Sequence, residues 1–401
     1  IDLGVSALSN FISGLLPEGM LKDLLVNGVI SGTGSVLVFL PNIIILFFFI
    51  SLLEATGYMA RAAFIMDKIM HRFGLHGSSF IPLIMGFGCN VPAILATRSM
   101  RNRGDRLLTM LIIPFMSCSA RLPVYILIIS AFFHEYQVLY LIGIYLTGIV
   151  FAFITAQILN KTVFKNKETP FVMELPTYRL PTIRNILYHM WDKTQHYIKK
   201  IGTIILLSAV IIWALGYFPR ETKKSDQLLT KIEQVNQDSF LDETEKQGKI
   251  TELNQQLESD LLINSYLGKF GKFIEPVMRP LGFDWKMSIS LIVGLPAKEI
   301  VVSTMAVLYQ SSEDENTVNL QQKLKNEYHE TGKRKGQKIF TTPAALAFLI
   351  FVLIYFPCIG VIATIKNESG AWKWALFTVF YTTALAWIAA FIVFNIGNLF
   401  L

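Results

Sequence analysis

The sequence carries little charge for its length. Only 16% of its 401 residues are Asp, Glu, Lys or Arg, whereas soluble domains carry about 25%, and 53% of the residues are hydrophobic. Residues 36–53 and 203–215 hold no charged residue and, with their flanks, approach the roughly 20 residues that a helix needs to cross a bilayer. The composition therefore predicts an all-α polytopic membrane protein rather than a soluble domain.

The chain is also poor in cysteine and lacks common catalytic motifs. Its three cysteines, Cys89, Cys118 and Cys358, all lie in apolar segments, so each is either a small packing residue or a ligand, and a disulfide framework is not expected. The sequence contains no HExxH, CxxC or GxxxxGK[ST] motif. We therefore expect neither an enzyme nor a structural zinc site nor GTP hydrolysis by this chain.

Eight apolar segments are predicted as membrane spans. Basic residues gather in the loops beside them, so the net charge of +7 fits the positive-inside rule and does not indicate a nucleic-acid partner. With the basic loops in the cytoplasm, eight crossings place both chain ends there, provided that residues 54–78 form a loop. The segments are about residues 33–53, 79–97, 107–131, 138–160, 201–218, 286–309, 343–365 and 373–400.

The segments divide into two predicted halves of four spans each. We expect the insertion at 219–285 to be external, with a helical hairpin over 221–262, and the insertion at 311–342 to be a cytoplasmic loop. Because residue 1 is isoleucine, the chain is expected to be a fragment or a processed product. The predicted parts are an amphipathic interfacial segment (1–32), the first half (33–160), a basic cytoplasmic linker (161–200) and the second half (201–401) with its two insertions.

Two motifs recur in the two halves. LIMGFGCNVPAILA (83–96) aligns without gaps with LIVGLPAKEIVVST (291–304), and IPFMSCSARLPV (113–124) corresponds to YFPCIGVIAT (355–364). Glycine and proline free backbone groups, which are tolerated at membrane depth only inside the protein or beside a watery cavity. The predicted helix breaks are Gly86, Gly88 and Pro92 in the first half and Gly294, Pro296 and Pro357 in the second.

Broken segments at matching positions of two halves point to the central site of a transporter. Packing glycines in an ordinary span are the alternative for a single motif, but the second copy favours a broken helix that lines a path. The alignment places Asn90 opposite Lys298, and Cys118 opposite Cys358. It leaves open whether the two repeats are parallel or inverted.

The chemistry of the motif residues favours a transported cation. A carboxylate inside the membrane is costly, so Glu299, next to Lys298, is interpreted as functional rather than as a structural ion pair. Thiol, amide and carboxylate ligands suit Fe(II), Co(II) or Zn(II) and are poor for Mg(II) or Ca(II). The predicted path residues are Cys89, Asn90, Cys118, Cys358 and Glu299, supported by Ser117, Ser119, Lys298, Glu54 and Met85.

Several long stretches resemble the membrane domain of FeoB-type ferrous iron transporters. They include PLIMGFGCNVPAILATRSM, PFMSCSARLPVY, SLIVGLPAKEIVVSTMAVLY and YFPCIGVIATI. The resemblance implies Fe(II) uptake across the bacterial inner membrane, with Cys89, Cys118 and Cys358 as gate cysteines and Glu299 as the acid of the second gate. It also implies a cytoplasmic N-terminal G domain that binds GTP with Mg, accessory Feo proteins and a homo-oligomer.

The chain departs from that pattern in three respects. It has no phosphate loop, its insertion at 221–262 is long, and Ala297 stands where the first repeat has Cys89. The function expected from the sequence is a multi-pass Fe(II) path gated by a G domain that this chain lacks, with no permanently bound cofactor. The alternatives are a carrier for a nucleoside-like organic solute and a transporter of another divalent metal such as Mn(II) or Zn(II).

Overall fold

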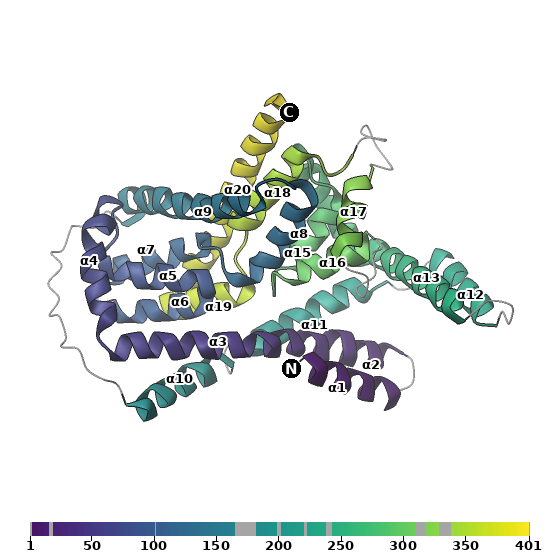
Figure 1. Ribbon diagram of the computed structural model, residues 1–401, viewed down its shortest axis with the longest axis horizontal. Helices are drawn as coiled ribbons and strands as arrows, with labels where there is room; N and C mark the ends of the chain where they lie inside the picture. Colours follow the sequence, from purple (N-terminus) through teal and green to yellow (C-terminus); the bar gives the residue numbers. More distant parts are fainter. Residues whose placement is uncertain are drawn as a thin grey trace. The chain divides into compact units, whose positions relative to one another are not determined.

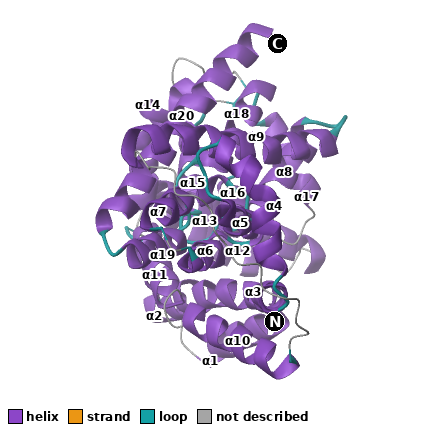
Figure 2. Ribbon diagram, turned by 90° about the vertical axis from the view of Figure 1, so that its left-hand side faces the viewer, coloured by secondary structure: helices purple, strands orange, loops and turns teal. Residues whose placement is uncertain are grey.

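The computed structural model is helical throughout the part that it describes. These residues are 2–15, 19–100, 102–164, 182–198, 202–219, 223–237, 243–309, 317–328 and 338–400. They contain no β-strand (Figure 2). Their one isolated β-bridge joins Tyr328 to Lys338. The prediction of an all-α fold is confirmed.

The chain forms two compact units, and these cut across the predicted halves. The first unit comprises Ile1–Leu122, Ile142–Ala209 and Leu353–Leu385, and the second comprises Pro123–Leu141, Val210–Val352 and Ala386–Leu401. Each unit therefore takes segments from both sequence repeats. The repeats are recurring motifs rather than separately folded domains.

The first unit holds the first pair of short helices and the helix that follows Cys358. In Figure 1, α6 lies beside α19 and α10 lies beside α3, and both pairs are in contact. The helices of this unit are α1 (Asp2–Leu15), α2 (Met20–Asp23), α3 (Ser31–Ala55), α4 (Tyr58–Arg72), α5 (Phe80–Gly88), α6 (Asn90–Ala96), α7 (Arg103–Ile112), most of α9 (Gln137–Leu159), α10 (Ile183–Tyr197), the start of α11 (Thr203–Tyr217), α19 (Ile359–Ser369) and the first part of α20 (Trp372–Phe400).

The second unit holds the other pair of short helices. The predicted helical hairpin is present as α12 packed on α13, although its place outside the bilayer stays a prediction. Phe283 packs edge-on against Phe348 and Phe351 in the core of this unit. The helices are α8 (Leu122–Phe132), α12 (Lys223–Gln237), α13 (Glu243–Asn264), α14 (Tyr266–Met278), α15 (Trp285–Val293), α16 (Ile300–Leu308), α17 (Thr317–Asn326), α18 (Thr342–Ile354) and the end of α20.

Three segments that we predicted as loops contain helices. Residues 54–78 form α4, which bends by 83° from the preceding helix, Ile44–Ala55. This helix forms because apolar residues recur at helical spacing, with Ala63 and Met70 buried and charged residues on other faces. The predicted linker 161–200 contains α10, and the predicted loop 311–342 contains α17.

In the described part, four helical stretches are long and apolar enough to cross a membrane, and the bent pair Ile44–Ala55 and Tyr58–Arg72 adds a fifth only if it is counted as one span. The four stretches are Arg103–Phe132, Gln137–Phe164, Thr342–Ser369 and Trp372–Leu399. The predicted segments 79–97 and 286–309 are instead pairs of short helices, α5 with α6 and α15 with α16, and each pair packs on itself. Eight full spans are therefore not confirmed.

Hydrogen bonds also contradict the sides of the membrane that we predicted for the loops. Arg98, in a loop predicted to be cytoplasmic, bonds to Glu368, predicted to be external. Lys286, at an external end, lies 2.6 Å from Glu327 in the loop predicted to be cytoplasmic. Such contacts cannot reach across a hydrocarbon core of about 30 Å. These contacts do not fit a topology in which all eight segments cross.

Candidate functional site in the broken helices

Each of the three cysteines lies at a helix break. The backbone is extended at Cys89 (φ −150°, ψ 129°), Cys118 (φ −75°, ψ 159°) and Cys358 (φ −60°, ψ 154°). Each cysteine directly precedes a helical segment: α6, the 3₁₀ turn that leads into α8, and α19. None of the three forms a disulfide bond. All three are half-buried and lie in the first unit. The helical structure is thus interrupted at all three cysteines, including Cys118, where no break was predicted.

The break at Cys89 is held by a hydrogen bond from the break at Cys118. Gly88 ends α5, and its carbonyl accepts a hydrogen bond of 3.1 Å from the Ser119 hydroxyl. Because Ser119 follows Cys118, this bond ties the backbone beside Cys89 to the backbone beside Cys118. The chain thus brings two of the predicted path segments together.

Two residues predicted as helix breaks lie inside helices. Gly86 is within α5, where a Cβ would stand 2.8 Å from the Cβ of Met116, so this glycine allows a close approach between segments. Pro92 lies in the first turn of α6, where a missing N–H leaves no hydrogen bond unmade. The backbone leaves the helix at Cys89 itself.

Asn90 begins α6 and is the most telling polar residue of the break. Its side chain is only 4% exposed, and its Oδ1 has no hydrogen-bond partner. A buried acceptor without a partner costs about 1–3 kcal/mol. An amide oxygen can ligate a cation, so this atom fits a site that a passing ion completes.

The copy of the first motif at residues 291–304 is also broken, and it lies in the second unit. Gly294 follows α15, Pro296 lies in the following loop, and Glu299 directly precedes α16. Lys298 is 2% exposed and Glu299 is half-buried. The helical structure is interrupted at Gly294 and Pro296, and Pro357 lies in the non-helical stretch before Cys358.

The predicted path residues do not form a closed metal site. Within the described part of the chain, no three His, Cys, Asp or Glu residues come close enough together to hold a metal ion. The cysteines belong to the first unit and Glu299 to the second. Any cation in the first unit would meet single thiols and Asn90 rather than a preformed cage.

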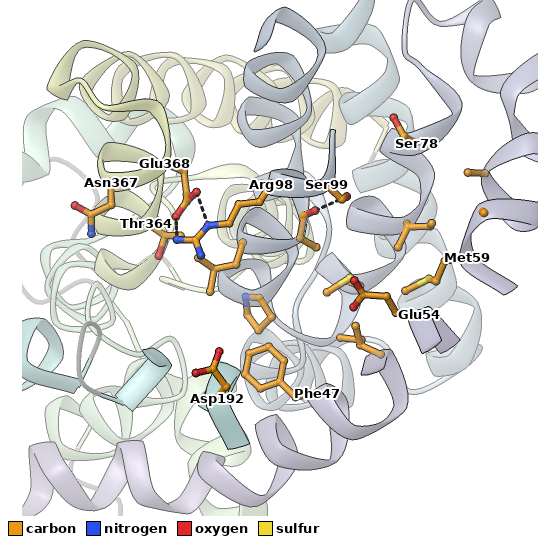
Figure 3. A pocket seen from close by; sticks show the side chains of 18 of the residues that line it. Phe47, Glu54, Met59, Ser78, Arg98, Ser99, Asp192, Thr364, Asn367 and Glu368 are labelled. Carbon is orange, nitrogen blue, oxygen red and sulfur yellow. Dashed lines mark hydrogen bonds and ion pairs between the residues drawn. The ribbon is translucent and has the colours of Figure 1, made fainter. Parts of the chain in front are cut away.

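A cavity of about 500 Å³ opens in the first unit (Figure 3). Three residues predicted from the sequence line it: Glu54, Met85 and Pro92. Asp192 of α10 and Asn367 of α19 add polar groups. The cavity therefore gathers carboxylate, amide and thioether groups at one end of the first helix pair, although most of its wall is apolar.

An ion-pair cluster at the cavity was not foreseen from the sequence. Glu368, whose side chain is 5% exposed, accepts hydrogen bonds from Arg98 Nε (2.8 Å) and Arg98 Nη2 (2.5 Å) (Figure 3). It also accepts one from Arg106 Nη2 (2.6 Å). The bond to Glu368 raises the pKa of Arg98. The cluster joins the end of the first helix pair to α19 from the second repeat.

Comparison with known proteins places these features in a family. The family model described as "Nucleoside recognition" (Gate) matches residues 36–132 and 198–372, and the model described as "Ferrous iron transport protein B C terminus" matches residues 141–193. The chain belongs to the Gate family, and its residues 141–193 match the C terminus of ferrous iron transport protein B. The two Gate-matched ranges contain all three cysteines, Asn90 and Glu299.

Similar FeoB-family proteins are about twice as long as this chain. An Fe(2+) transport protein A/Fe(2+) transporter FeoB fusion protein from Porphyromonas gingivalis is 51% identical over 100% of this chain and 47% of the relative. Fe(2+) transporter FeoB from Campylobacter jejuni is 42% identical over 100% of this chain and 60% of the relative, and that from Staphylococcus aureus is 42% identical over 99% and 52%. No solved structure gives a significant match.

A buried arginine holds the break at Cys118. Arg121 is 1% exposed and donates from both Nη1 and Nη2 to the Pro114 carbonyl, at 3.3 Å each. Pro114 precedes Cys118, so the arginine satisfies a carbonyl that the broken helix leaves free. The sequence showed Arg121 in an apolar segment but not its partner, which the fold alone supplies.

Proposed function

We propose that this chain forms the membrane path of a bacterial FeoB-type transporter for Fe(II). The observation that carries the proposal is the first break, where the half-buried Cys89 adjoins the partnerless Oδ1 of Asn90. Relatives that match the whole chain are named as Fe(2+) transporters. The chemistry of the break suits Fe(II) among other borderline divalent metals, and the names of the relatives select Fe(II) from that group.

The ligand set suits an ion that must leave again. Fe(II) binds thiolate, amide oxygen and thioether, and it binds less tightly where few protein ligands meet it at once. Conduction requires a site favourable enough to enter and weak enough to leave. Single thiols at Cys89, Cys118 and Cys358 satisfy both demands better than a closed cage does.

Inward movement has an electrical drive of its own. A doubly charged ion gains about 4.6 kcal/mol per 100 mV of inside-negative potential, twice the value for one charge. A cytoplasmic G domain that binds GTP would then time the opening of the path in the bacterial inner membrane. The fused relative supports an accessory Feo protein as a partner, and a homo-oligomer remains part of the proposal.

The test is Fe(II) uptake by the full-length protein under anaerobic, reducing conditions. We expect Cys89→Ala to lower Fe(II) uptake by about tenfold or more, with the amount of protein in the membrane unchanged. Ser208→Ala is the matched control, because its hydroxyl only bonds within α11 to the Ile204 carbonyl.

The alternatives give different outcomes in the same assay. Wild-type uptake by alanine variants at all three cysteines would make the thiols packing residues and overturn the proposed path. Preferred uptake of Zn(II) or Mn(II) would replace Fe(II) as the substrate. Uptake of a nucleoside without any metal flux would establish the organic-solute carrier instead.

A further inference from the structure

The two short helix pairs cannot cross a membrane as single spans. Helices α5 and α6 contain 9 and 7 residues, and α15 and α16 contain 9 each. At 1.5 Å per residue, each is about 10–14 Å long, well short of the roughly 30 Å of hydrocarbon. The two helices of each pair pack on each other instead of continuing in line. Each pair therefore enters the membrane and returns to the face from which it came.

Contacts place both ends of the first pair on one face. Gly74, just before α5, accepts a hydrogen bond of 3.1 Å from Asn160 at the end of the span Gln137–Phe164. Arg98, just after α6, leads directly into the span Arg103–Phe132. These two spans are consecutive, so the start of one and the end of the other lie on the same face of the membrane. Gly74 and Arg98 share that face, which we call the first face.

Contacts place both ends of the second pair on the other face. His134 follows the span Arg103–Phe132 and therefore lies on the second face, where its Nε2 is 3.0 Å from Lys325 Nζ of the segment that follows α16. Glu327, next in that segment, pairs at 2.6 Å with Lys286 at the start of α15. Lys286 and Lys325 thus share the second face.

An independent contact agrees with this assignment. The span Thr342–Ser369 starts after the segment on the second face and must end on the first. Its end carries Glu368, which bonds to Arg98 and Arg106 on the first face. Each of these contacts joins two segments of the same compact unit. The face of the membrane on which each contact lies follows from the direction of the spans that lead to it.

The charges orient the two faces. The segments assigned to the first face are strongly basic, which places that face in the cytoplasm by the positive-inside rule. The second face carries the short loop with Glu135, the slightly acidic insertion 219–285, and the segment 317–328 with α17, where Lys323 and Lys325 accompany the single acid Glu327, so it is far less basic than the first face. The basic residues of the first face are Arg61, Lys68, Arg72, Arg98, Arg103, Arg106 and Lys161.

We propose that the chain carries two re-entrant hairpins that enter the membrane from opposite faces: α5–α6 from the cytoplasm and α15–α16 from outside. The two repeats are therefore inverted, which the alignment of the motifs left open. For Fe(II), a consequence that rests on the proposed function is that the Glu299 hairpin is reached from outside and the Cys89 hairpin from the cytoplasm.

The experiment maps the face of single introduced cysteines in the full-length protein with a membrane-impermeant maleimide. It compares intact spheroplasts with inverted vesicles and subtracts the labelling of the parent chain. Lys68→Cys and Lys373→Cys should react only in inverted vesicles, and Lys323→Cys only in spheroplasts. All three positions are exposed in the structure.

The eight-crossing topology predicts the reverse result at all three positions, and that result would overturn the inference. Arg103→Cys (cytoplasmic) and Tyr136→Cys (external) are the matched controls, because both topologies agree on them. Arg72→Cys and Gln322→Cys, also exposed, replace any variant that does not reach the membrane. Labelling needs no metal flux, so its outcome is separate from that of the Fe(II) proposal.

Discussion

Arg98 and Glu368, 270 residues apart in the chain, are joined by two hydrogen bonds, 2.8 Å from Nε and 2.5 Å from Nη2. Arg106 adds a third, and the acceptor carboxylate is almost completely buried. Glu368→Gln leaves two arginines facing a neutral amide, and we expect it to lower the free energy of unfolding by about 3 kcal/mol. The measurement is thermal unfolding of the purified protein in detergent.

The controls for this prediction differ in burial. Arg98 is 55% exposed, so Arg98→Gln should cost only about 1 kcal/mol. Glu135→Gln changes an exposed carboxylate and should change nothing. Equal unfolding temperatures for Glu368→Gln and Glu135→Gln would show that the cluster does not hold α19 to the first helix pair.

The close approach at Gly86 gives a second prediction. A Cβ there would lie 2.8 Å from Met116 Cβ and 3.1 Å from Met116 Cγ, so Gly86→Ala must displace the segment before Cys118. We expect a loss of about 1–3 kcal/mol in thermal unfolding. Gly143, within α9, has no atom within 4 Å of its Cβ position, so Gly143→Ala should cause no loss. A tolerated Gly86→Ala would contradict the contact.

The sequence was enough to find three of the breaks because their cause is local. Gly88, Pro296 and Pro357 sit where helical hydrogen bonding ends, and proline and glycine act on the neighbouring residues of the same chain. The helical content and the long apolar spans could be predicted in the same way, from composition and periodicity.

The sequence could not show which short helices fold back, because that depends on distant contacts. Nothing near Glu368 reveals that Arg98 will reach it, and nothing near Lys286 reveals Glu327. The mean hydropathy of residues 79–97 predicts a span, because it depends only on how many residues are apolar. It carries no information on the direction that the chain takes after Cys89. The predicted loop 54–78 failed for another reason: α4 mixes charged and apolar residues, as an interfacial helix does.

Substitutions at Asn90 can separate its effect on stability from its effect on transport. Because its Oδ1 is buried without a partner, Asn90→Leu should raise the free energy of unfolding by about 1 kcal/mol. If the oxygen serves the ion, the same variant should lower Fe(II) uptake, whereas Asn90→Asp should retain uptake because it keeps an oxygen ligand. Thermal unfolding and anaerobic uptake are measured on the same preparations. A Leu variant that is less stable, or that transports normally, would assign Asn90 a structural role.

A buried carboxyl at the base of the second hairpin predicts a pH dependence. Asp284 is 3% exposed, caps α15 by accepting from the Met287 N–H at 2.8 Å, and meets the Tyr309 hydroxyl at 3.3 Å. Burial raises the pKa of Asp284 from 3.8 to about 6, against the opposing influence of the Met287 N–H, Lys286 and Tyr309, while Glu275 raises it further.

Because the pKa is raised in the folded state, the folded protein binds the proton more tightly than the unfolded chain. The resulting stability is complete below about pH 3.8 and is lost as the pH rises through about 6. We expect the free energy of unfolding to be about 2 kcal/mol higher at pH 4.5 than at pH 7.5 from this group alone. Asp284→Asn, which can still cap the helix, should remove that component of the pH dependence. The exposed Asp192→Asn should retain it, and equal pH profiles for Asp284→Asn and the wild type would show that Asp284 is not the titrating group.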